Sequence, residues 1–138
     1  SASPQTPDLT AVIELIVDLQ NQFKIDKKRI YIMGLSMGGM GTFEAITRHP
    51  KLFAAAIPIC GGGDTRLVAN FAKKVPVWIF HGADDNVVHV NYSRSMVNAI
   101  EAAGGKVKYT EYPNVNHNSW DRAFAEPDLL PWLFHHKR

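Results

Sequence analysis

A Gly-x-Ser-x-Gly turn between an apolar run and a helical run constrains this chain more than any other stretch. Residues 30–33 are apolar and partly β-branched, as in a buried strand, and they lead directly into Gly34-Leu35-Ser36-Met37-Gly38. A serine on such a sharp strand-to-helix turn has its hydroxyl lifted out of the sheet. Because the residues two before and two after the serine nearly touch, we expect both Gly34 and Gly38 to be required for their lack of a Cβ.

Apolar runs alternate with amphipathic runs along the chain. Thr6 followed by Pro7 is typical of a helix start, and apolar residues then recur every three or four positions as far as Phe23. Strand-like runs follow at 29–33, 53–60, 75–80 and 106–112, and helical runs at 37–49, 65–74, 91–103 and 119–134. This alternation predicts an α/β fold with a mostly parallel sheet and helices on both faces, in one domain spanning residues 1–138.

Polar residues of chemical interest follow three of the strand-like runs. Ser36 follows the first run and His117 follows the fourth. Two neighbouring carboxylates, Asp84 and Asp85, follow the third. The carboxyl ends of parallel strands lie at one edge of a sheet, where ligands bind, so we expect these side chains to share that edge.

The composition excludes several classes of function. The net charge is only +2, and no long basic run indicates a nucleic-acid partner. No apolar run approaches the ~18 residues of a membrane span. A single cysteine, Cys60, excludes an internal disulfide, and its place at the end of an apolar run predicts a small buried side chain.

A reactive serine needs two helpers. Its hydroxyl is a poor nucleophile at neutral pH, so a base must take its proton and a third group must fix the tautomer of that base. The chain order Ser36, then an aspartate, then His117 is the order found in α/β-hydrolases. Asp84 and Asp85 both remain candidates for the acid, because adjacent side chains point in different directions and only one can face His117.

Six histidines compete for the role of base. Only His117 lies in a loop directly after the last strand-like run. The others lie at a helix end, before the acid, too near the acid, or in the tail: His49, His81, His89, His135 and His136.

Attack on an acyl group creates an oxyanion that needs two preorganised donors. The backbone N–H of Met37 is the expected first donor, because it follows the serine and opens a helix. The second donor normally comes from a loop nearer the amino end of the chain. Only one helical run and one strand-like run precede Ser36, so the source of this donor is not evident.

Four segments resemble a microbial α/β-hydrolase carboxylesterase family that includes polyhydroxybutyrate depolymerase-like, feruloyl esterase-like and "predicted peptidase" esterases. They are residues 25–39 with the serine turn, 53–63, 76–88 and 112–120, and the likeness extends over residues 8–138. In the third segment, the family's His-Gly-x-x-Asp-x-x-Val pattern places the acid at Asp85 and the valine at Val88.

This resemblance implies hydrolysis of short-chain or aryl esters through a covalent acyl-Ser36, with no cofactor and no metal. A serine peptidase of the same fold is the alternative activity. Trp120, three residues after His117, is a candidate wall of the substrate pocket, although a tryptophan in this position is more often a core residue.

The chain departs from the family at its amino end. A complete member has further strands before the serine turn, and its second oxyanion donor lies among them. The resemblance therefore implies the C-terminal portion of the fold. We expect a second polypeptide, either an N-terminal half or another copy, to cover the apolar edge strand at residues 29–33. A catalytically incomplete fragment is the remaining alternative.

Overall fold

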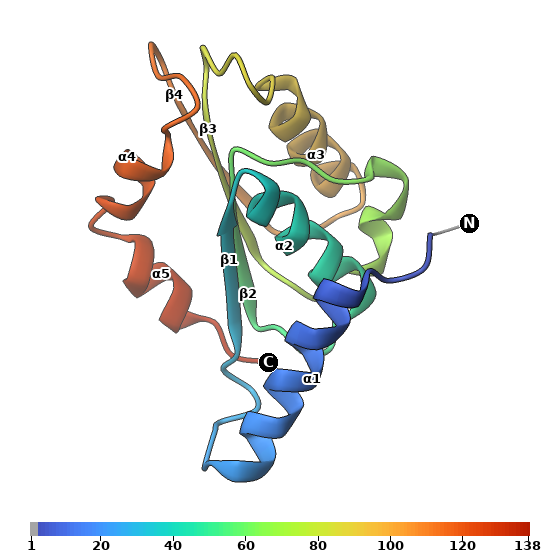
Figure 1. Cartoon of the computed structure of the whole chain (residues 1–138). Coiled ribbons are helices and arrows are strands. Elements are labelled where there is room, and N and C mark those ends of the chain that lie inside the picture. The colour runs from blue at the N-terminus through green and yellow to red at the C-terminus, as the bar shows by residue number, and fades with distance from the viewer. Residues whose placement is uncertain (1–2) are drawn as a thin grey trace.

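The computed structural model describes residues 3–138, which form a parallel sheet with helices on both faces (Figure 1). The elements in chain order are α1 (Pro7–Gln22), β1 (Tyr31–Leu35), α2 (Met37–Arg48), β2 (Ala55–Ile59), η1 (Thr65–Asn70), β3 (Val77–Gly82), α3 (Asn91–Ala102), β4 (Val107–Tyr112), α4 (Trp120–Phe124) and α5 (Leu129–His135). The strands pair in the order β1-β2-β3-β4, and every pair is parallel. The predicted α/β fold class is confirmed.

The alternation of side chains along the strands creates two apolar layers. On β3, Val77 and Ile79 face one layer, while Trp78 and Phe80 face the other. Helices α1, α2 and α3 pack with η1 on the first layer, and α4 and α5 cover the second (Figure 1). Both faces of the sheet are thus covered, as parallel strands require.

Local signals set the start of α1, as predicted. The Thr6 hydroxyl accepts a hydrogen bond of 3.2 Å from the N–H of Leu9, and Pro7 occupies the first helical position. The ends of the strands are determined by pairing with neighbouring strands and not by local signals. β1 ends at Leu35, rather than at the predicted residue 33, because its register with β2 continues to Leu35 opposite Ile59. The predicted helix at 65–74 is a shorter 3₁₀ helix, η1.

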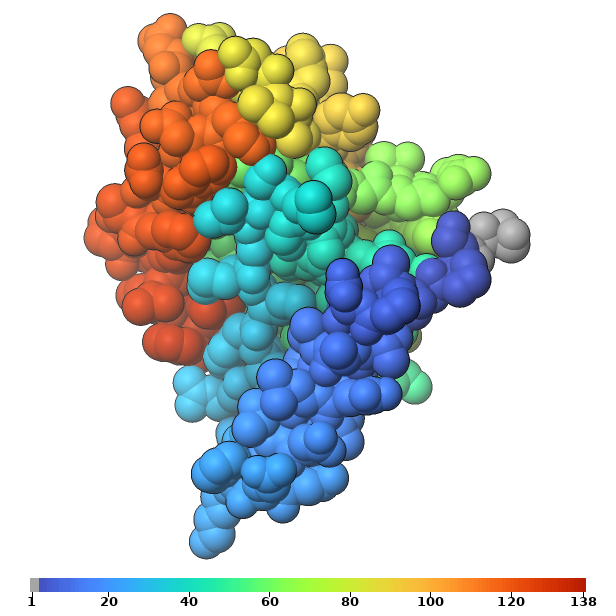
Figure 2. Space-filling view, viewed as in Figure 1, coloured from blue at the N-terminus to red at the C-terminus, as the bar shows by residue number. Residues whose placement is uncertain are grey.

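Within residues 3–138, β1 pairs with a strand on one side only. Met33 and Leu35 are consequently 39% and 36% exposed, whereas every residue of β2 is buried. In the view of Figure 2, β1 lies at the surface between α1 and the C-terminal helices. The interpretation of this run as a strand is confirmed, but the full burial that its apolar pattern indicates is not found.

None of the helices in residues 3–138 is both long enough and apolar enough to cross a membrane.

Candidate active site

Ser36 occupies the turn between β1 and α2 in a strained conformation. Its φ of 55° and ψ of −118° lie outside the regions that a serine prefers. Its N–H donates to the carbonyl of Ile59 at 2.8 Å, and its own carbonyl accepts from the N–H groups of Gly39 and Met40 at 2.9 and 3.1 Å. The turn is therefore pinned between β2 and the first turn of α2.

Of the two glycines that flank the serine, only Gly34 is required for space. A Cβ on Gly34 would lie 2.2 Å from the carbonyl oxygen of Gly38, whereas a Cβ on Gly38 would meet no atom within 4 Å. The expectation for Gly38 is wrong, because this residue presents its carbonyl to Gly34 and not its own Cα hydrogens. Gly39 does need to be small, since its Cβ would lie 2.7 Å from the carbonyl oxygen of Ile59.

The structure brings Ser36, His117 and one aspartate together at the carboxyl ends of the strands. Ser36 Oγ lies 2.8 Å from His117 Nε2, and His117 Nδ1 lies 2.8 Å from Asp85 Oδ2. Asp84 is exposed and contributes its backbone N–H to the carbonyl of Val115. Asp85, and not Asp84, therefore lies against His117.

Hydrogen bonds keep the Asp85 carboxylate ionised although its side chain is fully buried. Oδ1 accepts hydrogen bonds of 2.9 Å from the N–H groups of Val87 and Val88. Burial alone would raise the pKa of Asp85, but the hydrogen bonds from His117 and these two amides outweigh burial and lower it. A charged acceptor therefore faces Nδ1 of His117.

Two backbone loops hold the histidine beside the acid. The side-chain oxygen of Asn116 accepts from the N–H groups of Asn86 and His117 at 2.9 and 2.8 Å. Gly82 lets the loops meet, because a Cβ there would lie 2.3 Å from the carbonyl oxygen of Val115. The histidine loop is thus fastened to the end of β3 and to the acid loop.

His81 precedes the candidate acid in the chain, so it does not fit the order expected for the base. In the structure it is fully buried, with Nε2 2.7 Å from the carbonyl oxygen of Val88 and 3.3 Å from Asp85 Oδ2. Its Nδ1 lies 2.6 Å from the hydroxyl of Ser93. The signal available in the sequence was a histidine at the end of an otherwise apolar, buried run.

The two remaining predicted site residues flank the serine and the histidine. Met37 is the first residue of α2, so its backbone N–H has no acceptor within the helix. The Trp120 ring meets the His117 ring edge-on, with centroids 5.4 Å apart, and is half-buried against the core. Trp120 is thus a core residue that also lies beside the candidate base.

Cys60 lies behind this cluster, buried and at a φ of 43°. Burial raises the pKa of its thiol, which therefore stays protonated, in agreement with its prediction as a small buried side chain. Ligand atoms of Cys60, Asp85 and His117 lie within 4.8 Å of one another, so this group could hold a soft cation. Such an ion would compete with the hydrogen bond that already joins Asp85 to His117.

Comparisons with known proteins agree on one family. The family described as Phospholipase/Carboxylesterase matches residues 4–127. A bifunctional acetylxylan esterase/xylanase of Neocallimastix patriciarum is 30% identical over an alignment of 125 positions that covers 83% of this chain and 18% of that protein. A probable carboxylesterase of Oryza sativa subsp. japonica is 27% identical over an alignment of 147 positions, gaps included, that covers 99% of this chain and 54% of that protein.

A solved thermostable esterase is 45% identical and superposes with a TM-score of 0.94 over 96% of this chain and 38% of its own. The chain therefore spans only part of the length of the proteins it matches.

Proposed function

Since the chain belongs to the phospholipase/carboxylesterase family of α/β-hydrolases, we propose that it hydrolyses carboxylic esters through an acyl-enzyme on Ser36. The observation that carries this proposal is the continuous hydrogen-bonded path from Ser36 through His117 to Asp85, with two contacts of 2.8 Å. A serine, a base and an orienting acid in this geometry suit acyl transfer.

In the proposed reaction, His117 Nε2 takes the proton of Ser36 as Oγ attacks the acyl carbon. Asp85 accepts the hydrogen bond from Nδ1–H, which fixes the tautomer and stabilises the imidazolium. The N–H of Met37 binds the oxyanion. His117 then gives its proton to the departing alcohol. In the second half of the reaction His117 takes a proton from water, the water oxygen attacks the acyl carbon, and the carboxylic acid product leaves as Ser36 regains its proton.

Short-chain or aryl esters are the proposed substrates. The position of Trp120 supports this proposal, because its ring lies beside His117, where it can pack against the acyl or aryl group of the substrate. The acetylxylan esterase among the relatives supports a small acyl group. We expect Trp120→Ala to raise KM for p-nitrophenyl butyrate more than for p-nitrophenyl acetate, because the larger acyl group loses more contact. Equal KM values in wild type and variant would show that Trp120 does not contact the substrate.

Labelling with a fluorophosphonate probe, alongside turnover of p-nitrophenyl acetate, tests the proposed chemistry. We expect wild type to be labelled and Ser36→Ala to be unlabelled, with kcat reduced by several decades. Turnover of Ser36→Ala at the wild-type rate would overturn the assignment. A folded wild-type sample that is not labelled would indicate a catalytically incomplete fragment, and faster turnover of peptide substrates would indicate a peptidase.

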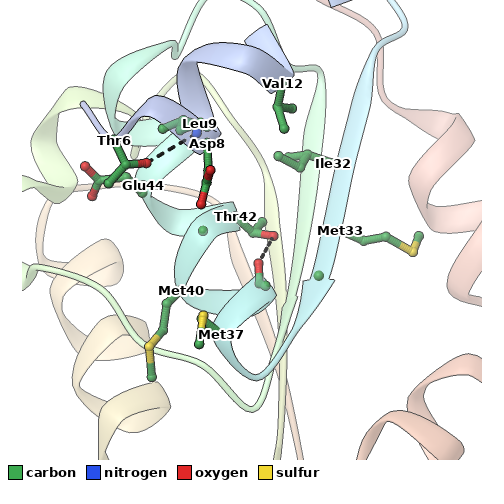
Figure 3. A pocket seen from close by; sticks show the side chains of 13 residues that line it. Thr6, Asp8, Leu9, Val12, Ile32, Met33, Met37, Met40, Thr42 and Glu44 are labelled. Atoms are coloured by element: carbon green, nitrogen blue, oxygen red, sulfur yellow. Dashed lines mark hydrogen bonds between the residues drawn. The ribbon is translucent and has the colours of Figure 1, made fainter. Parts of the chain in front are cut away.

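We also propose that a second polypeptide covers the free edge of β1 and supplies the second oxyanion donor. An apolar cavity of about 560 Å³ beside this edge supports the proposal. Figure 3 shows its lining from α1, β1 and α2, including Leu9, Val12, Ile32, Met37 and Met40.

Sedimentation velocity separates the two possible occupants of this edge. A second copy predicts a concentration-dependent dimer, whereas an N-terminal half predicts a monomer whose esterase activity rises when that half is added. A monomer with full activity on its own would contradict the proposal.

A further inference from the structure

His81 lies at the centre of a buried hydrogen-bonded group beneath the candidate acid. Its Nε2 contacts the carbonyl of Val88 at 2.7 Å and lies 3.3 Å from Asp85 Oδ2, and its Nδ1 contacts the Ser93 hydroxyl at 2.6 Å. His81 and Ser93 are 0% exposed and Asp85 is 5% exposed. None of the esterase steps described above uses His81 or Ser93.

The partners of His81 define its tautomer. The carbonyl of Val88 and the carboxylate of Asp85 can only accept, so Nε2 must carry a hydrogen. Burial lowers the pKa of His81, against smaller effects of the Val88 carbonyl and of Asp85 and Glu111, which raise it. A neutral ring with Nε2–H has an unprotonated Nδ1, and the Ser93 hydroxyl then donates to it.

We propose that His81, held in its Nε2–H tautomer by the Val88 carbonyl, is a positioning residue that sets the Asp85 carboxylate against His117. This inference rests on the proposed function and deepens it. Nε2–H donates to the carbonyl of Val88, and the N–H of Val88 donates to Asp85 Oδ1. Asp85 Oδ2 lies 3.3 Å from Nε2, so the ring is close to both carboxylate oxygens.

A neutral ring suits this task better than a charged one. A neutral N–H orients the carboxylate but leaves its negative charge available to the His117 imidazolium that forms during acyl transfer. A cationic ring at the same distance would compete with His117 for that charge. The burial that keeps His81 neutral therefore serves the proposed reaction.

Ser93 extends the same group toward the nucleophile. It lies on α3, and its oxygen packs 3.4 Å from the carbonyl oxygen of Gly61, while its single hydrogen goes to Nδ1 of His81. Gly61 packs directly on the first turn of α2, because a Cβ there would lie 2.7 Å from the carbonyl carbon of Gly39. One buried group thus joins the acid loop to the helix that carries Ser36 at its start.

The variants His81→Gln and His81→Asn form a matched pair for testing this inference. The glutamine amide reaches the position of Nε2 and can donate to Val88, whereas the asparagine amide reaches only the position of Nδ1. We expect His81→Asn to lower kcat for p-nitrophenyl acetate by about 10²-fold with little change in KM. We expect His81→Gln to retain most of the wild-type kcat.

The pH profile gives a second kinetic readout. In His81→Asn we expect the acid limb of kcat to move to lower pH, because a displaced carboxylate stabilises the His117 imidazolium less. The proposal would be overturned if His81→Asn and His81→Gln both lost kcat in proportion to their loss of stability and neither shifted the acid limb of kcat. His81 would then have a structural role only.

Nitrogen-15 NMR of histidine-labelled Ser36→Ala protein separates this inference from the proposed function, because it needs no turnover. We expect a neutral His81 with its proton on Nε2, and the same tautomer when Ser93→Ala is added, because the Val88 carbonyl can only accept. A ring protonated on Nδ1 alone would overturn the proposal. If the NMR result is as expected but the wild-type chain hydrolyses no ester, the proposed function fails and the hydrogen-bonded arrangement stands.

Discussion

Gly34 carries a steric requirement that Gly38 and Gly41 do not share. Its Cβ would lie 2.2 Å from the Gly38 carbonyl oxygen and 2.9 Å from the Thr42 hydroxyl, so Gly34→Ala must open the turn. We expect this variant to lose about 10²-fold in kcat, as a small misplacement of the nucleophile does, and to be destabilised by ~1–3 kcal/mol. Esterase assays and urea unfolding measure the two effects.

Gly41→Ala is the matched control for this substitution. A Cβ there meets no atom within 4 Å, and the residue lies inside α2. Alanine should therefore stabilise the protein by up to about 1 kcal/mol and leave kcat unchanged. If both substitutions behaved alike, the steric argument for Gly34 would fail.

Asp85 makes a charge-dependent contribution to stability as well as to the proposed reaction. Its pKa is lower in the folded chain than in the unfolded chain, so its contribution is present above the unfolded value of ~3.9 and is lost as pH falls through the folded value. We expect Asp85→Asn to unfold at lower urea than wild type at pH 7, with a difference that shrinks below pH ~4.

The same Asp85→Asn variant should lose several decades of kcat, because an amide no longer stabilises the imidazolium. Asp84→Asn serves as the control, since Asp84 is exposed and only its backbone contacts the histidine loop. Equal losses in both variants would contradict the placement of the acid at Asp85.

Chain order was enough to propose Ser36 and His117 as nucleophile and base, because each of them follows its own strand. It was not enough to separate Asp84 from Asp85, since two adjacent loop residues have the same pattern and differ only in direction. His81 could not be assigned a role from the sequence, because its partners Ser93 and Val88 reach it only through the fold.

Among the elements, an ion pair joins α3 to β4. The Arg94 guanidinium forms two contacts of 2.8 Å with the Glu111 carboxylate, and this pairing lowers the pKa of Glu111 to about 2. Glu111 therefore contributes stability above its ordinary pKa of about 4.5, and that contribution is lost as pH falls toward 2.

We expect Glu111→Gln to lower the unfolding midpoint at pH 7 and to match wild type near pH 2, as measured by urea titration at several pH values. The exposed Glu101 of α3 supplies the control, Glu101→Gln, which should leave the midpoint unchanged at both pH values. A Glu111→Gln midpoint equal to wild type at pH 7 would show that the pair contributes nothing measurable.

Element positions were predicted well where local chemistry decides them and less well where pairing does. Thr6 and Pro7 define the start of α1 from neighbouring residues alone. The end of β1 depends on how far β2 continues beside it, so the predicted boundary missed Gly34 and Leu35. For the same reason, β3 ends at Gly82 and not at the predicted residue 80, because its register with β4 continues to Tyr112.

For the whole molecule, apolar surface is concentrated on the side that carries α1 and β1. Val12 is 47% exposed, Leu15 56% and Met33 39%. We expect the isolated chain to bind an apolar fluorescent dye. The double variant Val12→Lys/Met33→Lys should bind less of this dye. Leu130→Lys on α5, where the side chain is 51% exposed, should leave it unchanged. Equal reductions in both variants would contradict a localised patch.

The alternation of strands and helices was sufficient to predict a parallel sheet covered on both faces. It could not show how much of β1 is exposed, because exposure depends on what lies beside an edge strand and not on its own apolar pattern. Within residues 3–138, the structure confirmed the predicted edge position of β1 and supplied the strand order β1-β2-β3-β4.

The strand order β1-β2-β3-β4 also bears on how the protein is made. Each strand pairs with the one synthesised just before it, so the sheet can grow as the chain leaves the ribosome, without waiting for distant segments. Ser36 follows the first of these strands and His117 follows the last. A nascent chain therefore carries Ser36 before the proposed base, His117, has been synthesised.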